Sequence, residues 1–165
     1  MNICLCPMTK ELAREYFRGF VVDPALFLPG QEYRPYVYTE EKADAAVDRH
    51  LSLGRVYLAV MRDREPIGEI VLKNIDSEKH HCTIGISLRS DDVKNRGYGT
   101  EAEIQALHYA FKQIGMETVF ADSIIQNTRS QNVLEKVGFI ESHRDDSFIY
   151  YRCDVDRWTD PKIRK

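Results

Sequence analysis

Two glycines one residue apart, Gly97 and Gly99, stand between an apolar strand-like segment and an amphipathic segment. The second segment carries apolar residues at helical spacing, namely Ile104, Leu107, Phe111 and Ile114. A helix that begins at such a turn leaves its first backbone N–H groups without intrahelical partners, at the positive end of its dipole. Glycine has no Cβ, so an anion can approach these amides closely. The chemistry that this stretch indicates is the binding of a phosphate group.

The backbone amides of this turn are expected to hold the anion more firmly than its cationic side chains. A hydrogen bond to a charged group contributes roughly 1.5–3 kcal/mol, whereas an exposed ion pair contributes roughly 0–1 kcal/mol. We therefore expect the amides from Arg96 to Thr100 to bind the phosphate. Lys94 and Arg96, interpreted as exposed cations, would steer it.

A glycine pair alone is a weak signal, because plain turns and nucleotide-binding loops also contain one. The pair can be a plain turn before a helix. Residues 97–102 also satisfy the dinucleotide fingerprint G-x-G-x-x-A, with Asp122 twenty residues further on. However, eight residues separate Leu88 from Gly97, and too few residues follow for a full dinucleotide domain. A Walker loop does not fit, because no Gly-Lys-Ser/Thr follows the glycines.

Hydrophobic periodicity and turn signals predict strands and helices in a mixed order. Helices are expected at 10–20, from Thr39 to Gly54, from Gly97 to Ile114 and from Asn127 to Val137, and strands at 2–7, 56–61, 66–72, 82–88, 117–124, 140–144 and 147–154. Residues 73–79 are expected to form a polar turn, and Ala46, Val47, His50 and Leu51 a buried helix face. This order predicts a mixed sheet with a central right-handed crossover.

Length and composition indicate one ordinary globular domain over residues 1–165, with 43% hydrophobic and 30% charged residues. The net charge is -3 and no basic face is evident, so we do not expect a nucleic-acid partner. The four cysteines show no C-x-x-C spacing, which favours reduced thiols and no metal site. Because neither a secretory signal nor a membrane-length apolar run is present, a cytoplasmic location and no membrane partner are expected.

Two stretches carry a family resemblance. Residues 94–102, KNRGYGTEA, resemble the pyrophosphate-binding motif of the GNAT family of N-acetyltransferases, and residues 127–139, NTRSQNVLEKVGF, resemble that family's second signature. The pairing is most similar to the subgroup that includes ribosomal-protein N-terminal acetyltransferases. The resemblance implies a single-domain α/β (α+β) acyl-CoA N-acyltransferase fold, with a mixed, mostly antiparallel sheet that splays at the cofactor site and about four flanking helices.

The resemblance also implies a reaction and a site. The reaction is acetyl transfer from acetyl-coenzyme A to an amine, either a peptide N-terminus or a small molecule, without a metal; a homodimer is left open. The implied contacts with coenzyme A come from Ile86, Ser87, Leu88, Val93, Lys94, Asn95, Arg96, Gly97, Tyr98, Gly99, Thr100, Asn127 and Ser130. Residues 93–100 would hold the pyrophosphate, the main chain of residues 86–88 and Asn127 the pantetheine arm, and Ser130 would lie near the thioester sulfur.

The chain departs from the family's pattern at both acid/base positions. Thr83 stands where many relatives carry a general-base Glu, and Leu134 where many carry a Tyr that protonates the leaving thiolate. Ser130, Glu69 or a tyrosine of the 33–38 loop are the candidate catalytic replacements, although a carboxylate such as Glu69 more often lies on the solvent face of its strand. A loop with Tyr33, Tyr36 and Tyr38 is the candidate acceptor-binding segment, and packing is the alternative role of these tyrosines.

The missing base bears on the choice of acceptor, because the attacking amine must be neutral. Deprotonating an α-amine of pKa ~8 at pH 7 costs about 1.4 kcal/mol, whereas a lysine amine of pKa ~10.4 costs about 4.6 kcal/mol. We therefore expect an α-amine or another weakly basic amine, attacking the thioester directly. The same missing residues leave one alternative function open, an acyl-CoA-binding module without turnover.

Overall fold

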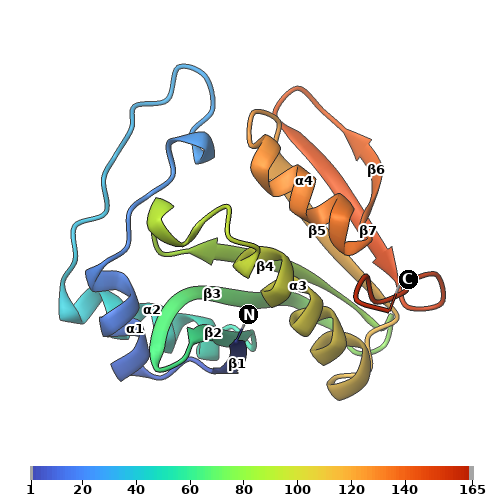
Figure 1. Ribbon diagram of the computed structural model, residues 1–165, viewed down its shortest axis with the longest axis horizontal. Coiled ribbons are helices and arrows are strands. Elements are labelled where there is room, and N and C mark those ends of the chain that lie inside the picture. The colour runs from blue at the N-terminus through green and yellow to red at the C-terminus, as the bar shows by residue number, and fades with distance from the viewer. Residues whose placement is uncertain (1, 164–165) are drawn as a thin grey trace.

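A computed structural model describes residues 2–163 and contains one seven-stranded sheet in the order β1-β2-β3-β4-β5-β7-β6 (Figure 1). Neighbouring strands are antiparallel except for the single parallel pair β4 and β5. The strands are β1 (Ile3–Pro7), β2 (Val56–Arg62), β3 (Glu65–Asp76), β4 (His81–Leu88), β5 (Thr118–Ile124), β6 (Ile140–Arg144) and β7 (Phe148–Asp154). The sheet is mixed and mostly antiparallel, as the sequence predicted.

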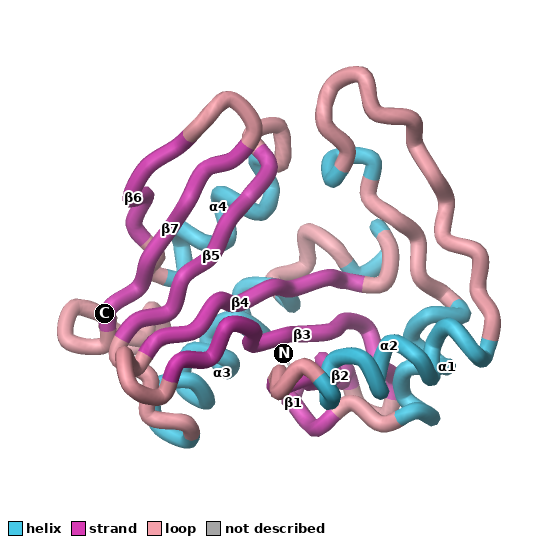
Figure 2. The backbone as a smooth tube through the Cα atoms, turned by 180° about the vertical axis from the view of Figure 1, so that it is seen from behind, coloured by secondary structure: helices cyan, strands magenta, loops and turns pink. Residues whose placement is uncertain are grey.

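Helices cover both faces of this sheet (Figure 2). The four α-helices are α1 (Lys10–Arg18), α2 (Glu40–Ser52), α3 (Tyr98–His108), which continues into a π-helical turn at Tyr109–Gln113, and α4 (Thr128–Val137). Helices α1 and α2 share one hydrophobic cluster with β2, whereas α3 and α4 share a second cluster with the other face. Two short 3-10 helices, Pro24–Leu26 and Asp91–Val93, lie in the loops.

The parallel strands β4 and β5 stay together for only three residue pairs. Their register joins His81 to Thr118, Cys82 to Val119 and Thr83 to Phe120, and it ends there. Beyond Thr83, β4 pairs only with β3. The edge of residues 84–88 that faces β5 therefore forms no backbone ladder. Figure 1 shows the two strands diverging beyond this point. The sheet is therefore splayed, as the resemblance implied.

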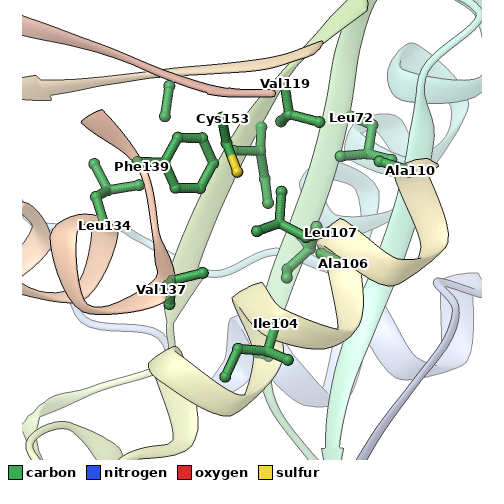
Figure 3. Close-up of a cluster of buried hydrophobic side chains, with 14 of the residues drawn as sticks. Leu72, Ile104, Ala106, Leu107, Ala110, Val119, Leu134, Val137, Phe139 and Cys153 are labelled. Carbon is green, nitrogen blue, oxygen red and sulfur yellow. The ribbon is translucent and has the colours of Figure 1, made fainter. Parts of the chain in front are cut away.

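A continuous core fixes α3 and α4 relative to the splayed strands (Figure 3). Leu107 and Ala106 of α3 are completely buried, and Leu134 and Val137 of α4 lie in the same cluster. Burial of a large aliphatic side chain contributes about 1.5–3 kcal/mol, so this cluster holds the helix starts firmly in place. The glycine turn and the start of α4 therefore face the splay as a rigid unit.

The structure corrects two predictions from the sequence. The predicted turn at residues 73–79 is largely strand, because β3 continues to Asp76 and Lys73 pairs with Thr83. On α2, Leu51 is 61% exposed; the helix buries Val47, as predicted, together with Ala43, while Ala46 and His50 are half-buried. The other predicted elements are present within a few residues of their expected bounds. No helix among residues 2–163 is both long enough and apolar enough to cross a membrane.

Candidate active site

The glycine turn has the geometry of an anion cradle. Gly97 precedes α3 with φ 82°, in the left-handed region that favours glycine, and Asn95 has φ 57°. No side chain among the described residues caps the start of α3, whereas Thr9 caps α1, Thr39 caps α2 and Asn127 caps α4. The first amides of α3 are therefore left for an outside acceptor.

Three cavities with shared lining residues run along the splay. The glycine-turn cavity, about 470 Å³, lies between the starts of α3 and α4 and is lined by Leu88, Lys94, Asn95, Gly97, Gly99, Thr100, Thr128, Arg129, Asn132, Val133 and Lys136. The central cavity, about 110 Å³, is lined by Val21, Asp23, Leu26, Ile86, Ser87, Leu88, Lys94, Gly99, Glu103, Asn127, Arg129, Ser130 and Val133. The splay cavity, about 220 Å³, lies between β4 and β5 and shares Leu26, Ile86, Glu103, Asn127 and Ser130 with the central one.

Ten of the thirteen residues implied to contact coenzyme A line these cavities, which brings the two sequence motifs together. The other three, Val93, Arg96 and Tyr98, do not line them. Val93 is completely buried in the core, and Arg96 is exposed. The Tyr98 ring lies 5.7 Å from the Arg62 guanidinium. These three can act only through their backbone or at the cavity rim.

Lys94 is not the exposed cation that the sequence suggested. Its side chain is 10% exposed, and its Nζ lies 2.8 Å from Asp23 Oδ2 and 3.2 Å from Asp91 Oδ1. Arg129 Nη1 approaches the same two carboxylates at 3.5 and 3.4 Å. Burial raises the pKa of Asp23, but the hydrogen bond from Lys94 and the backbone bond from Ala25 outweigh it and lower that pKa. The cations at the mouth are thus partly neutralised by acids.

Asp23 belongs to a segment of which the sequence assigned only the tyrosine loop, residues 33–38, to the site. Residues 19–39 connect α1 to α2, and this strap reaches the cavities at several points. The Val21 amide donates to the Arg89 carbonyl at 2.8 Å, and the Gln126 side chain donates to the Phe27 carbonyl. Leu26 lines both the central and the splay cavity. No local motif marks these residues, because their role depends on the path of the folded chain.

The start of α4 presents side chains to the central cavity. Asn127 Oδ1 accepts a hydrogen bond from the Ser130 backbone amide at 3.2 Å. This cap uses the oxygen of the Asn127 side chain and leaves its NH₂ group for a ligand carbonyl. The Ser130 side chain lies on the same turn, and both residues line the central and splay cavities.

Glu69 lies on the face of the sheet opposite to the three cavities, and this face is not open to solvent at Glu69. Its carboxylate is half-buried, and its Oε2 accepts a hydrogen bond of 2.5 Å from the Tyr57 hydroxyl. Burial raises the pKa of Glu69, although the bond from Tyr57 opposes that rise. In the ladder Glu69 pairs with Ser87, which lines the central cavity. Because Tyr57 belongs to the hydrophobic cluster under α1 and α2, the Glu69 carboxylate lies on that face of the sheet, and it lines none of the three cavities.

The loop tyrosines pack mainly beside the helices. Tyr36 stacks on Phe17 of α1 with ring centroids 5.2 Å apart, and Tyr33 donates a hydrogen bond to the Val22 carbonyl at 3.2 Å. The Tyr38 hydroxyl is buried without a partner among the described residues. Glu69 is among the charges that raise the pKa of Tyr36, after burial and Tyr38. None of the three tyrosines lines the three cavities.

Glu103 is the most unusual group that the sequence reasoning missed. It lies one turn into α3, only 1% exposed, and its Oε2 has no hydrogen-bond partner among the described residues. Burial alone raises the pKa of its carboxyl to about 8. The available signal was a Glu four residues before Leu107, on the buried side of an amphipathic helix.

The cavities fit an extended ligand with a phosphate end and an amide chain. The glycine turn offers backbone donors, the free edge of β4 offers main-chain groups, and Asn127 offers an NH₂ group. At the acid/base positions, Leu134 is 3% exposed inside the core and carries no proton to transfer. Within residues 2–163 no group of three His, Cys, Asp or Glu side chains could hold a metal ion.

Comparisons with known proteins agree with this geometry. The sequence model of the acetyltransferase (GNAT) domain matches residues 2–140. The chain is 31% identical over 104 residues to an uncharacterized N-acetyltransferase, YnaD, of Bacillus subtilis (strain 168), and this match spans 62% of the chain and 60% of that relative's length.

Solved structures show the same fold. The ribosomal-protein-S5-alanine acetyltransferase from Vibrio fischeri has a TM-score of 0.77 at 19% identity, over 96% of each chain. The Campylobacter jejuni N-acetyltransferase PseH in complex with acetyl coenzyme A has a TM-score of 0.61 at 22% identity, over 70% of this chain and 79% of that one. At these identities the likeness concerns the fold alone, and it confirms the predicted fold.

Proposed function

The chain belongs to the acetyltransferase (GNAT) domain family, a family of acetyl-coenzyme A-dependent N-acetyltransferases, and from this premise we propose that it acetylates an α-amine or another weakly basic amine by direct attack. The observation that carries the proposal is the splay of β4 from β5, with an uncapped helix start at its mouth. A peptide N-terminus is the acceptor that this chemistry favours. The likeness to the ribosomal-protein acetyltransferase is one of fold and adds no evidence about the acceptor.

The cofactor side of the site is proposed to hold coenzyme A. The α3 amides after Gly97 would bind the pyrophosphate, and the free edge of residues 86–88 would pair with the pantetheine amides as an added strand does. When bound, acetyl-coenzyme A supplies the activated acyl group. A main-chain N–H near Leu88 would stabilise the charge that develops on the carbonyl oxygen.

The acceptor side is proposed to lie on the face that carries Glu69. A carboxylate whose pKa is raised by burial accepts a proton more readily near neutral pH than an ordinary one. Glu69 would take the proton that the amine loses as the C–N bond forms and the C–S bond breaks. Ser130, on the cofactor side, would donate a hydrogen bond to the departing sulfur, which gains its proton from solvent.

An acceptor panel tests this proposal. We expect release of coenzyme A thiol with short peptides that carry a free α-amine, and at least tenfold weaker turnover with lysine side chains or polyamines, because their amines are more fully protonated. Strong activity on the latter and none on α-amines would refute the acceptor assignment.

A Glu69→Gln variant tests the base. We expect kcat to fall by about 10²-fold and the acid limb of its pH profile to flatten, because the amide cannot take the proton. Affinity for acetyl-coenzyme A should stay unchanged, since Glu69 lines none of the three cofactor-side cavities. An unchanged kcat would remove Glu69 from the mechanism.

One observation favours a second candidate function. Leu134 is buried where many relatives are implied to carry an acidic Tyr, so the chain can be an acyl-coenzyme A-binding module that does not turn over. Such a module would bind coenzyme A with no acceptor-dependent thiol release from any amine in the panel.

A further inference from the structure

Glu103 is a buried carboxyl that the proposed acetyl transfer does not use. It lines both the central and the splay cavity, where these meet beneath β4. Its Oε2 is buried and makes no hydrogen bond to any described residue. An unsatisfied buried polar atom costs roughly 1–3 kcal/mol, so a group retained in this state points to a partner outside the described residues.

The neighbours of Glu103 show what kind of partner is missing. The residues that share both of its cavities are apolar or neutral, and they come from β4, α4 and the strap: Ile86, Asn127, Ser130 and Leu26. None of them is a cation that could form an ion pair with the Glu103 carboxylate. The missing partner is therefore a neutral hydrogen-bonding group that reaches the cavity from outside.

Charged groups do line the two cavities. In the central cavity Lys94 and Arg129 each form an ion pair with Asp23. In the splay cavity Lys73 comes from β3 and Asp122 from β5. None of these groups shifts the pKa of Glu103, which burial alone raises to about 8, so the carboxyl is mostly protonated at pH 7.

We propose that the Glu103 carboxyl is a hydrogen-bonding partner for an amide of the pantetheine arm. The inference rests on the proposed function, because it takes coenzyme A as the ligand of the central cavity. A protonated carboxyl has both a donor and an acceptor, so it matches an amide, which also has both. An ionised carboxyl would lose its donor and would be buried further by the ligand, at a large desolvation cost.

The sign of the pH effect follows from this. The amide of the ligand hydrogen-bonds to the neutral carboxyl and stabilises that form, so the pKa of Glu103 in the complex lies above its value in the free protein. Affinity for acetyl-coenzyme A is therefore constant below about pH 8 and falls by up to about tenfold per pH unit above it. Binding at pH 8.5 takes up protons from the buffer.

Calorimetry with acetyl-coenzyme A from pH 6.5 to 9.5 tests the proposal on the full chain, in buffers of different ionisation enthalpy. The wild type should show the decline and the proton uptake. Glu103→Gln, which keeps the size and hydrogen bonding of the side chain, should bind within about threefold of wild type at pH 7 and show neither. Glu103→Leu should bind about tenfold more weakly at pH 7. Its free form should be more stable than wild type, since an unsatisfied atom is removed.

Each outcome bears on a different claim. A wild-type decline of affinity above pH 8 together with wild-type proton uptake in Glu103→Gln would overturn the inference, and so would undiminished binding by Glu103→Leu. If Glu103→Leu does not fold, the pH profile of Glu103→Gln decides alone. A wild type that binds acetyl-coenzyme A without either effect refutes the role of Glu103 and leaves the proposed function intact. A wild type that gives no heat with acetyl-coenzyme A refutes both.

Discussion

The starts of α3 and α4 border the same glycine-turn cavity, yet they satisfy their backbone groups in different ways. At α4 the side chain of Asn127 accepts a hydrogen bond from the Ser130 amide, as Thr9 and Thr39 do at α1 and α2. At α3 the preceding residue is Gly97, and no described side chain caps the helix. A capped start offers a ligand its side chains, whereas an uncapped start offers its amides and its dipole.

The largest loss of affinity is expected from a substitution that distorts the uncapped start of α3. Gly97→Val places a β-branched residue at φ 82°, which forces the turn to change and disperses the amides. Losing two hydrogen bonds to a charged pyrophosphate costs about 3–6 kcal/mol, so affinity for acetyl-coenzyme A should fall by at least 10²-fold. Calorimetry measures this loss directly.

The matched control is Gly54→Val. Gly54 has φ 65° after α2, with open space around the position of a Cβ, so the substitution brings similar backbone strain away from the site. It should lower the melting temperature while leaving affinity for acetyl-coenzyme A unchanged. An equal loss of affinity in both variants would mean that general strain, and not the amide cradle, causes the effect.

A smaller effect is expected from removing the cap of α4. Asn127→Ala should cost about 1 kcal/mol of stability through the lost cap. It should also weaken acetyl-coenzyme A about tenfold, because the NH₂ group that faces the central cavity is lost as well. Thr39→Ala removes a cap of the same kind from α2, and it should reproduce the loss of stability without the loss of affinity. A parallel loss of affinity in both would show that Asn127 is only a cap.

Lys94→Ala should weaken acetyl-coenzyme A less than either change, by under about tenfold. Its ammonium group already forms ion pairs with Asp23 and Asp91, so part of its charge is neutralised before any phosphate binds. Calorimetry on this variant and on Gly97→Val sharpens the comparison between backbone and side chains. Equal losses in the two would show that the cation holds the pyrophosphate as strongly as the amides do.

The case of Lys94 illustrates what the sequence could and could not predict. Local patterns predicted the helices that begin at residues 10 and 39 and the glycine turn, because helix starts and positive φ depend on residues a few positions apart. They could not identify Asp23 as the partner of Lys94. These two residues lie 71 positions apart and meet only because the strap crosses the site.

The same limit applies to Glu69 and Glu103. A single charged residue in a strand or helix is most often exposed, so the pattern left open whether Glu69 faces solvent, and the sign that Glu103 is buried was limited to its spacing from Leu107. The fold places Glu69 against Tyr57, and it places Glu103 beneath the splay of β4 and β5. The sequence therefore predicted the glycine turn and named Glu69 as a candidate, but it predicted neither the contact of Glu69 with Tyr57 nor the burial of Glu103.

The smallest expected effect has the opposite sign and concerns the cations beside both helix starts. Asp23 pairs with Lys94, next to the start of α3, and approaches Arg129 of α4. Asp23→Asn keeps the oxygen that accepts a hydrogen bond from the Ala25 amide, but it removes the charge. The two cations then attract the pyrophosphate more strongly, so affinity for acetyl-coenzyme A should rise about two- to fivefold at low salt, and the gain should shrink at high salt.

Asp44→Asn, which breaks a pair with Arg14 between α1 and α2, is the matched control and should leave affinity unchanged. Weaker binding by Asp23→Asn would mean that Asp23 holds Lys94 in the position where it binds the pyrophosphate. The side chains at the cavity mouth would then contribute more to the affinity for acetyl-coenzyme A than the comparison of the two helix starts implies.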